Sequence, residues 1–438
     1  MSQFLGVGHP QSLSDQSLSL TDASKLFKIK YEKLSENVYN SANVLLGRVK
    51  KSYNFTGKQL QLTIPQSFAG GVGSGKLPSP NVAQYSEAII KAKKVYAVVE
   101  IDRETIKAAL SDEGSFVRAT KEVVKKGVES YMRNMSRILF NDGSGELGTS
   151  LTSAVQADVD VVEALSSGNT VIKIASMKEA NFEERDLVDI EPDSGALDTA
   201  AVDGKEIISV DPDAKTITVK GDIRTKFLDA AVGTAVGSGQ SLKPAKIFMQ
   251  NSKNNDPIGL KVLSNEAGAA SLHEVARGRR WNAQVEDASS AAVSTDLLNK
   301  MMLKVKKACG KSPNLIVCSY TQYEKILNLL EDQKRYTVNT RAGLKSKSGA
   351  DISFSGVEFM SIDGPIGIFP ERFIEDDRIY LLNDSHIHIY HRPDFGWFDD
   401  DGTVFLRKAG EDSYEARYGG YLETYINPCF HGVIHNLS

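Results

Sequence analysis

The spacing of apolar residues predicts a long two-stranded hairpin in the first quarter of the chain. Leu60, Leu62 and Ile64 alternate with polar residues within the stretch 59–68, and the same alternation returns at 95–101. Apolar residues with a period of two share one side of a strand. Arms of about 12–15 residues reach roughly 40–50 Å at 3.3 Å per residue. A hairpin of this length cannot bury both faces against its own domain, so we expect it to lie on something else.

Helical spacing of apolar residues follows over residues 115–140, where Tyr131 and Leu139 belong to one apolar stripe and charged residues cover the other side. At 1.5 Å per residue this helix is about 39 Å long, enough to form the spine of a domain. A second helical pattern covers residues 21–46, and Gly47 is expected to stop it.

Residues 150–250 have a different pattern, with short strand-like runs separated by Asp, Pro and Gly. The stretch "VDPDAKTITV" is typical of a β-hairpin with its turn at Asp211–Lys215. This segment is therefore predicted to form a small antiparallel barrel or sheet inserted into the main domain.

The rest of the chain mixes helices and strands. A helix capped by Ser294 or Thr295 is expected to close at Gly310. After it, "PNLIVCS" predicts a buried strand and "TQYEKILNLLEDQ" a helix, and the chain ends in aromatic, strand-like sequence. Between these parts lies a basic loop, whose cations are Lys334, Arg335, Arg341, Lys345 and Lys347.

Composition narrows the class of protein. The 438 residues are 41% hydrophobic and 25% charged with a net charge of −4, which is typical of a soluble folded protein without marked affinity for nucleic acid. No apolar run approaches the ~20 residues of a membrane span, and the N-terminus does not resemble a secretory signal. Cys309, Cys318 and Cys429 are odd in number and lack CxxC spacing, which predicts reduced thiols, synthesis in a cytoplasm and no zinc site.

A glycine-rich stretch, "SFAGGVGSGKLPSPN", contains most of a phosphate-binding loop between Gly70 and Lys76. Leu77 stands where such a loop needs Ser or Thr to hold magnesium. Pro78 and Pro80 oppose the helix whose N-terminus would complete the anion site. The stretch is better interpreted as the flexible tip of the long hairpin.

Three other motifs also favour ordinary structural roles. Gly143, Gly145 and Gly148 spell GxGxxG, but a helix precedes them where a dinucleotide site needs a strand, so we interpret them as a helix stop. His386, His388 and His391 are interpreted as an exposed or interfacial strand face rather than a metal site. The run Asp399–Asp401 is interpreted as a solvated turn. The sequence predicts no active site, no cofactor and no metal.

In order, these features resemble the major capsid proteins of tailed bacteriophages, with the Hong Kong 97-type fold. One stretch resembles the return of that family's extended E-loop followed by its spine helix: "VYAVVEIDRETIKAALSDEGSFVRATKEVVKKGVESYMRNMSRILFNDGSGELG". The stretch "STDLLNKMMLKVKKACGKSPNLIVCSYTQYEKILNLL" resembles its axial-domain helix, strand and helix. "ISFSGVEFMSIDGPIGIFPERFIEDDRIYLLN" and "EARYGGYLETYINPCFHGVIHNL" resemble its later strands. The resemblance covers roughly residues 20–438.

The resemblance implies an α+β Hong Kong 97-type fold divided into six segments. These are an N-terminal arm (1–53), the E-loop hairpin (54–101), a peripheral domain with the spine helix (102–149), an inserted β-rich module (150–250), a mainly axial α/β domain (251–390), and C-terminal strands that return to the peripheral domain (391–438).

The resemblance also implies a structural subunit that assembles with itself into hexamers and pentamers, forming an icosahedral shell around packaged DNA. The hairpin would gain burial only on a neighbouring subunit, through a tip made of Gly70, Gly71, Gly73, Gly75 and Lys76. The basic loop would lie at the capsomer centre. We expect DNA to be contacted only non-specifically, and no membrane to be involved. The shell would be a virion capsid assembled in the bacterial host cytoplasm.

Partners follow from the same resemblance. Some members carry a scaffolding region of about a hundred residues before the arm, for which this chain has no room. A separate scaffolding protein is therefore expected, together with a portal and decoration proteins. Some members also crosslink a loop Lys covalently to an Asn. Lys58 and Lys76 are available for this, but the sequence does not identify the Asn or an activating carboxylate, so no crosslink is predicted.

Two alternatives stay open. An encapsulin-type nanocompartment shares the fold and would enclose enzyme cargo instead of DNA. A less favoured alternative of another class is a nucleotide-binding enzyme that uses Gly70–Lys76.

Overall fold

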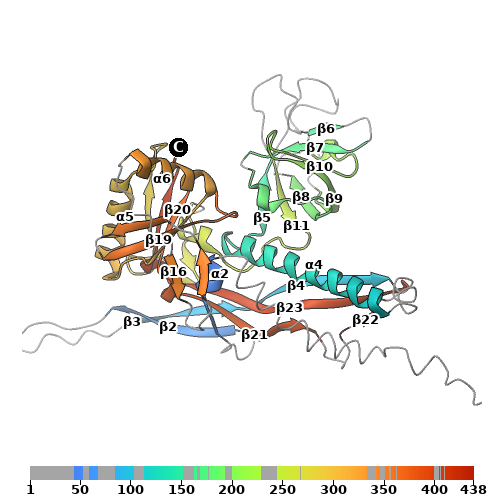
Figure 1. Ribbon diagram of the computed structural model, residues 1–438, viewed down its shortest axis with the longest axis horizontal. Coiled ribbons are helices and arrows are strands. Elements are labelled where there is room, and N and C mark those ends of the chain that lie inside the picture. The colour runs from blue at the N-terminus through green and yellow to red at the C-terminus, as the bar shows by residue number, and fades with distance from the viewer. Residues whose placement is uncertain are drawn as a thin grey trace, which may run out of the picture. The chain divides into compact units, whose positions relative to one another are not determined.

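The computed structural model describes most of the chain from Val44 onward (Figure 1). The described residues are 44–52, 59–67, 84–102, 113–150, 162–164, 168–175, 177–192, 200–227, 244–266, 268–332, 342–345, 351–354, 357–361, 363–398, 404, 406–408 and 410–438. Their contacts divide the chain into two units, one formed by described residues within 95–133 and 393–420, the other by the remainder. The six-segment division stays a prediction.

The smaller unit combines one long helix with strands. α4 covers Glu113–Leu139, close to the predicted 115–140, and its residues up to 133 belong to this unit. The strands that contribute to it are β4 (Lys93–Asp102), β21 (Ile387–Trp397), β22 (Leu406–Arg407) and β23 (Ser413–Ile426). Val95, Ala97 and Val99 on alternate positions of β4 are buried. A Cβ atom on Gly127 would lie 2.3 Å from Val99, so the helix packs closely on this strand.

Tyr131 of α4 packs edge-on against Tyr418 of β23, with ring centroids 5.1 Å apart, and Trp397 of β21 contacts the same ring at 5.2 Å. The other side of β4 is more open, since Tyr96 and Val98 are 39% and 60% exposed. The alternating apolar residues of β4 thus face this chain's own helix, whereas the sequence predicted that they lie on another surface.

In the larger unit, β2 (Gln59–Ser67) and β3 (Gln84–Lys91) form an antiparallel hairpin (Figure 1). Its first arm is the predicted one, but the prediction that residues 95–101 form the returning arm is wrong, because they belong to β4, which pairs with β23. One face is buried within the chain itself: Leu62, Ile64 and Ala88 pack in a cluster with Trp281 and Val275. The expectation that the hairpin gains burial only on a neighbouring subunit is therefore wrong for these residues. The sequence pattern could not show that residues 258–281 supply a large indole and several aliphatic side chains beneath the hairpin.

The short strands β12 (Ser271–Leu272) and β13 (Val275–Ala276) form a small hairpin beside β3. The backbone N–H of Ile89 donates to the carbonyl of His273 at 3.0 Å. The long hairpin is thus anchored both by hydrogen bonding and by burial.

The inserted segment forms one seven-stranded sheet, in the order β5-β11-β8-β9-β10-β7-β6, which agrees with the expected β-rich module. Its strands are β5 (Glu146–Thr149), β6 (Val162–Ala164), β7 (Thr170–Lys173), β8 (Leu187–Pro192), β9 (Val202–Asp211), β10 (Thr216–Val219) and β11 (Ala245–Met249). The predicted turn at Asp211–Lys215 is confirmed, because β9 and β10 pair antiparallel across it. The module has its own core, which includes Ile172, Ile190, Ile217, Phe227 and Ile247.

The last part of the larger unit is a six-stranded mixed sheet with the order β14-β24-β20-β15-β19-β18. These strands are β14 (Gln284–Asp287), β15 (Leu315–Cys318), β18 (Val357–Ser361), β19 (Gly364–Pro370), β20 (Ile379–Leu382) and β24 (Gly432–His435). All four residues of β15 are buried, which confirms the predicted buried strand. Beside the sheet lie α5 (Thr295–Cys309) and α6 (Tyr320–Asp332) (Figure 1).

The caps of α5 are those that the sequence predicted. The Ser294 hydroxyl accepts a hydrogen bond from the N–H of Leu297 at 3.2 Å, and Gly310 closes the helix with φ 75°. Among the remaining elements, α2 (Val44–Arg48) is followed by β1 (Lys50–Ser52), which pairs parallel with β21. β16 (Ala342–Lys345) and β17 (Asp351–Phe354) form a separate hairpin.

The cysteines differ from expectation. Cys309 and Cys429 form a disulfide, with Cα atoms 6.1 Å apart and a sequence separation of 120. In this structure the pair is oxidised, contrary to the prediction of three reduced thiols, because pairing over such a separation is decided by how α5 packs on the C-terminal segment. Cys318 is a free, buried thiol.

Candidate functional site

The residues that the sequence singled out for assembly lie almost entirely outside the described part of the chain. This applies to Gly70, Gly71, Gly73, Gly75 and Lys76, and to Lys334, Arg335, Arg341 and Lys347. Lys345 ends β16, where it is paired in register with Asp351 of β17. The contact roles of the tip and of the basic loop therefore stay predictions.

The hairpin that carries the tip has two unlike faces. Leu62, Ile64 and Ala88 lie on the buried face, whereas Tyr85, near the end toward the tip, is 60% exposed. An exposed tyrosine combines a large apolar ring with a polar hydroxyl, a combination that is enriched at protein interfaces. The described arms are thus held by their own chain on one side and open to solvent on the other.

The glycine motif after α4 behaves as a helix stop. Gly143 and Gly145 have φ of 87° and 79°, in the left-handed region that glycine adopts readily, and Gly148 lies in β5. Gly145 is also packed closely, since a Cβ atom there would lie 2.3 Å from the Ser252 carbonyl oxygen. The order helix, turn, strand is the reverse of a dinucleotide-binding motif.

The histidines do not converge. The His386 ring stacks on Phe430 with centroids 3.6 Å apart, and its Nε2 lies 3.4 Å from Lys311 Nζ. Burial, helped by the Lys311 charge, lowers the pKa of His386 to about 4. Within the described residues, no group of three or more His, Cys, Asp or Glu is placed to hold a metal ion. The aspartates 399–401 lie outside those residues.

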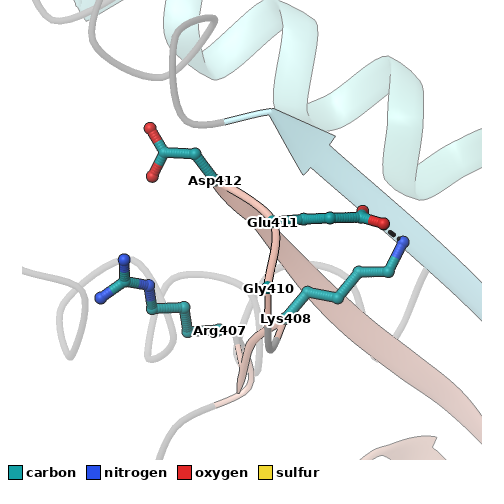
Figure 2. Close-up of a pocket in the computed structure, with 5 residues that line it drawn as sticks. All are labelled: Arg407, Lys408, Gly410, Glu411 and Asp412. Carbon is teal, nitrogen blue, oxygen red and sulfur yellow. Dashed lines mark ion pairs between the residues drawn. The ribbon is translucent and has the colours of Figure 1, made fainter.

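A surface hollow of about 490 Å³ lies at the turn between β22 and β23 (Figure 2). Lys408 Nζ pairs with Glu411 at 2.6 Å and with Glu100 of β4 at 3.2 Å. Figure 2 shows Arg407 and Asp412 directed away from the Lys408–Glu411 pair. These charges are exposed, and exposed pairs contribute little energy. The hollow is a solvated turn whose charges do not converge on a common point.

A second cavity, of about 230 Å³, is lined by the partly buried charges of Lys178, Lys261 and Glu375. Lys178 Nζ and Lys261 Nζ lie 3.1 and 3.0 Å from the same oxygen of Glu375, which also pairs with Arg378. Burial opposes ionisation of Glu375, but Lys178, Arg378 and Lys261 outweigh it and lower its pKa to about 2. Burial lowers the pKa of Lys178.

Each cation in this cavity already faces a carboxylate, so the cluster is a structural ion-pair network rather than an activated acid or base. Lys178 comes from the inserted module, while the other members lie beyond residue 260 in the sequence. Nothing in the local sequence around Lys178 signalled this network.

The described helices offer no membrane-spanning candidate, since none combines sufficient length with sufficient apolar character.

Comparison with known proteins gives one family match, which covers part of the chain. Residues 226–401 match the model of the SU10 major capsid protein family, which is 176 of the 438 residues. No curated protein sequence matches the chain.

Three solved structures have a similar course of the chain over most of its length. The capsid of cyanophage A-1(L) is 10% identical, covers 89% of this chain and 90% of its own, and has a TM-score of 0.46. Mycobacterium phage Bobi gives 11% identity, 96% and 99% coverage and a TM-score of 0.41. The holo-SrpI encapsulin complex of Synechococcus elongatus PCC 7942 is 8% identical, with 90% of this chain and 87% of that chain covered and a TM-score of 0.42.

The family match rests on sequence pattern within the very part of the chain that forms the end of the inserted module and most of the mixed sheet. The long hairpin β2–β3, the spine helix α4, the inserted β module and the α/β sheet follow in the order of the Hong Kong 97-type fold. The match of residues 226–401 therefore supports a tailed-bacteriophage major capsid protein, a structural subunit of a capsid shell.

Proposed function

We propose that the subunit assembles with itself into hexamers and pentamers, which tile an icosahedral virion shell around packaged DNA. The observation that carries this proposal is the hairpin β2–β3. Its base is fixed on its own chain, while Tyr85 toward the tip stays exposed. The exposed part of such a hairpin can contact a neighbouring subunit while the buried residues stay packed on their own chain.

The tip residues Gly70–Lys76 would contact that neighbour, and the basic loop with Lys334, Arg335 and Arg341 would lie where copies meet at the capsomer centre. The four glycines between Gly70 and Gly75 provide no side chains for packing, so their ordering needs an external surface.

The test of self-assembly is the oligomeric state of the purified chain as its concentration is raised. Sedimentation velocity and negative-stain images should show hexamers, pentamers or shells. A monodisperse monomer at high concentration, with its hairpin protected from protease, would contradict the proposal.

The net charge of −4 favours only non-specific contact with DNA, so filling the shell would need a portal and a packaging motor. We also propose a separate scaffolding protein, decoration proteins, and assembly in the host cytoplasm. Particles isolated from infected cells should contain nuclease-protected DNA. Particles with enzyme cargo and no DNA would favour the encapsulin alternative instead.

We further infer that the subunit is not an enzyme, because the Gly70–Lys76 stretch lacks the hydroxyl and the helix that a phosphate loop needs. Purified protein and its Lys76→Ala variant should give the same null result in a titration with ATP and magnesium. Micromolar binding that is lost in Lys76→Ala would reverse this inference.

A further inference from the structure

The disulfide joins two elements that already hold each other without it. Cys309 is the last residue of α5, and Cys429 lies in the short 3-10 helix η6 (Pro428–Phe430) directly before β24. A Cβ atom on Gly432 of β24 would lie 2.8 Å from Met301 and 2.9 Å from Val305, so α5 packs tightly on this strand. Leu298, Met301 and Val305 are all at most 1% exposed. This region therefore has packing between α5 and β24 in addition to the covalent bond.

The half-cystine at Cys309 is accessible from solvent. Cys309 is half-buried, and the next residue, Gly310, is exposed. Lys311 lies over the Phe430 ring at 5.5 Å, so a cation stands beside the residue that follows Cys429. Thiol–disulfide exchange needs access and a thiolate, and nearby cations favour the thiolate.

The third cysteine does not compete. Cys318 is fully buried in β15, and burial raises the pKa of its thiol to about 12. It is thus protected from attack and from exchange. Only one pairing of the three cysteines is open to an oxidant that acts on the folded subunit.

We propose that Cys309 and Cys429 form a redox-sensitive staple, reduced while the subunit is made and assembled, and closed once the shell reaches oxidising surroundings. Structural disulfides do not persist in a reducing cytoplasm. The timing rests on the proposed function, which places assembly there. The staple itself requires only the geometry of α5 and η6.

The closing step needs a low-molecular-weight disulfide such as oxidised glutathione. One cysteine thiolate attacks a sulfur of that disulfide, forming a mixed disulfide and releasing one thiolate. The second cysteine thiolate then attacks the protein sulfur of the mixed disulfide and expels the other thiolate. Both cysteines lose a proton, the protein is oxidised by two electrons, and the small disulfide is reduced to two thiols.

The experiment counts thiols in the full-length protein. Cells producing it are lysed into an alkylating agent, and the number of alkylated cysteines is measured by mass after denaturation. Three are expected. Protein purified with reductant and then treated with oxidised glutathione should retain a single thiol and melt at a higher temperature than the reduced form.

On treatment with oxidised glutathione, the Cys318→Ser variant should still lose two free thiols and its melting temperature should still rise. Cys309→Ser and Cys429→Ser should lose both. Reduced wild type serves as a second measure of the open state, should either variant fold poorly. A disulfide already present in alkylated lysates, no closure by oxidised glutathione, or a reduced form that is unfolded would each overturn the proposal.

Particle formation is scored by negative stain on the same samples. Absence of shells with the expected thiol counts would contradict the proposed assembly and leave the staple supported. Shells with thiol counts other than those expected would support the proposed assembly and contradict the staple.

Discussion

Gly259 occupies a position that admits no side chain. A Cβ atom there would lie 2.3 Å from the carbonyl oxygen of Ile138 and 2.4 Å from that of Asn141, at the end of α4. Backbone atoms cannot move aside as a flexible side chain can. Gly259→Ala should therefore destabilise the subunit by about 2–3 kcal/mol through overpacking, measured by urea unfolding of the unassembled protein.

Gly278 is the matched control, because a Cβ atom there would meet no heavy atom within 4 Å. Gly278→Ala should change the free energy of unfolding by less than about 0.5 kcal/mol. Equal effects of the two substitutions would show that the close approach at Gly259 is relaxed in solution.

Glu371 gives a prediction about pH. Burial raises its pKa to about 8, although the backbone N–H of Val44, which donates at 3.2 Å, favours the charged form. The folded state then binds more protons at this site than the unfolded state between the ordinary carboxyl pKa and about 8. Its contribution to stability is greatest at low pH and is lost as the pH rises through that interval.

Glu371→Gln has no proton to lose and keeps an oxygen to accept from Val44. Relative to wild type, the variant should gain at least ~1 kcal/mol of unfolding free energy between pH 5 and pH 9, since one pKa unit corresponds to about 1.4 kcal/mol. Parallel pH profiles for the two proteins would contradict the assigned pKa.

At the scale of elements, the prediction concerns whether the hairpin β2–β3 packs on its own subunit. Ala88 is fully buried beside Trp281 and Leu272. Ala88→Asp places an unpaired charge in this cluster and should destabilise the unassembled subunit by about 3 kcal/mol. Trp281 fluorescence during urea unfolding would report the loss.

Thr63 lies on the opposite, exposed face of the same hairpin. Thr63→Asp should leave subunit stability almost unchanged. If Ala88→Asp is equally silent in the free subunit and affects only assembly, then the hairpin leaves its own chain in solution and packs on a neighbour alone.

At the scale of the whole molecule, the hairpin tip should matter for the shell and not for the subunit. Deleting Gly70–Pro78 removes residues beyond the described strands β2 and β3, so the thermal unfolding of the free subunit should barely change. Assembly, followed by sedimentation, should fall.

Limited proteolysis gives an independent reading of the same tip. Cleavage near Gly73 should be fast in the free subunit and much slower after assembly. A deletion that unfolds the monomer, or cleavage that is equally slow in both states, would place the tip in the subunit's own core.

The sequence by itself determined the elements whose signals are local. The apolar stripe predicted α4, period-two alternation predicted β2 and β4, and Ser294 with Gly310 predicted both ends of α5. Each signal depends on residues a few positions apart, because helix and strand periodicity and capping act over one or two turns. The order of these elements was enough to indicate a capsid fold.

Only the tertiary structure decided which distant residues meet. In the fold, Cys309 bonds to Cys429 and Ala88 packs against Trp281. Lys178 and Lys261 both form ion pairs with Glu375. The tertiary structure also explained Gly259 through the end of α4, more than a hundred residues earlier. Such contacts leave no periodic trace in the chain, since a side chain's partner across the fold is set by how whole elements pack.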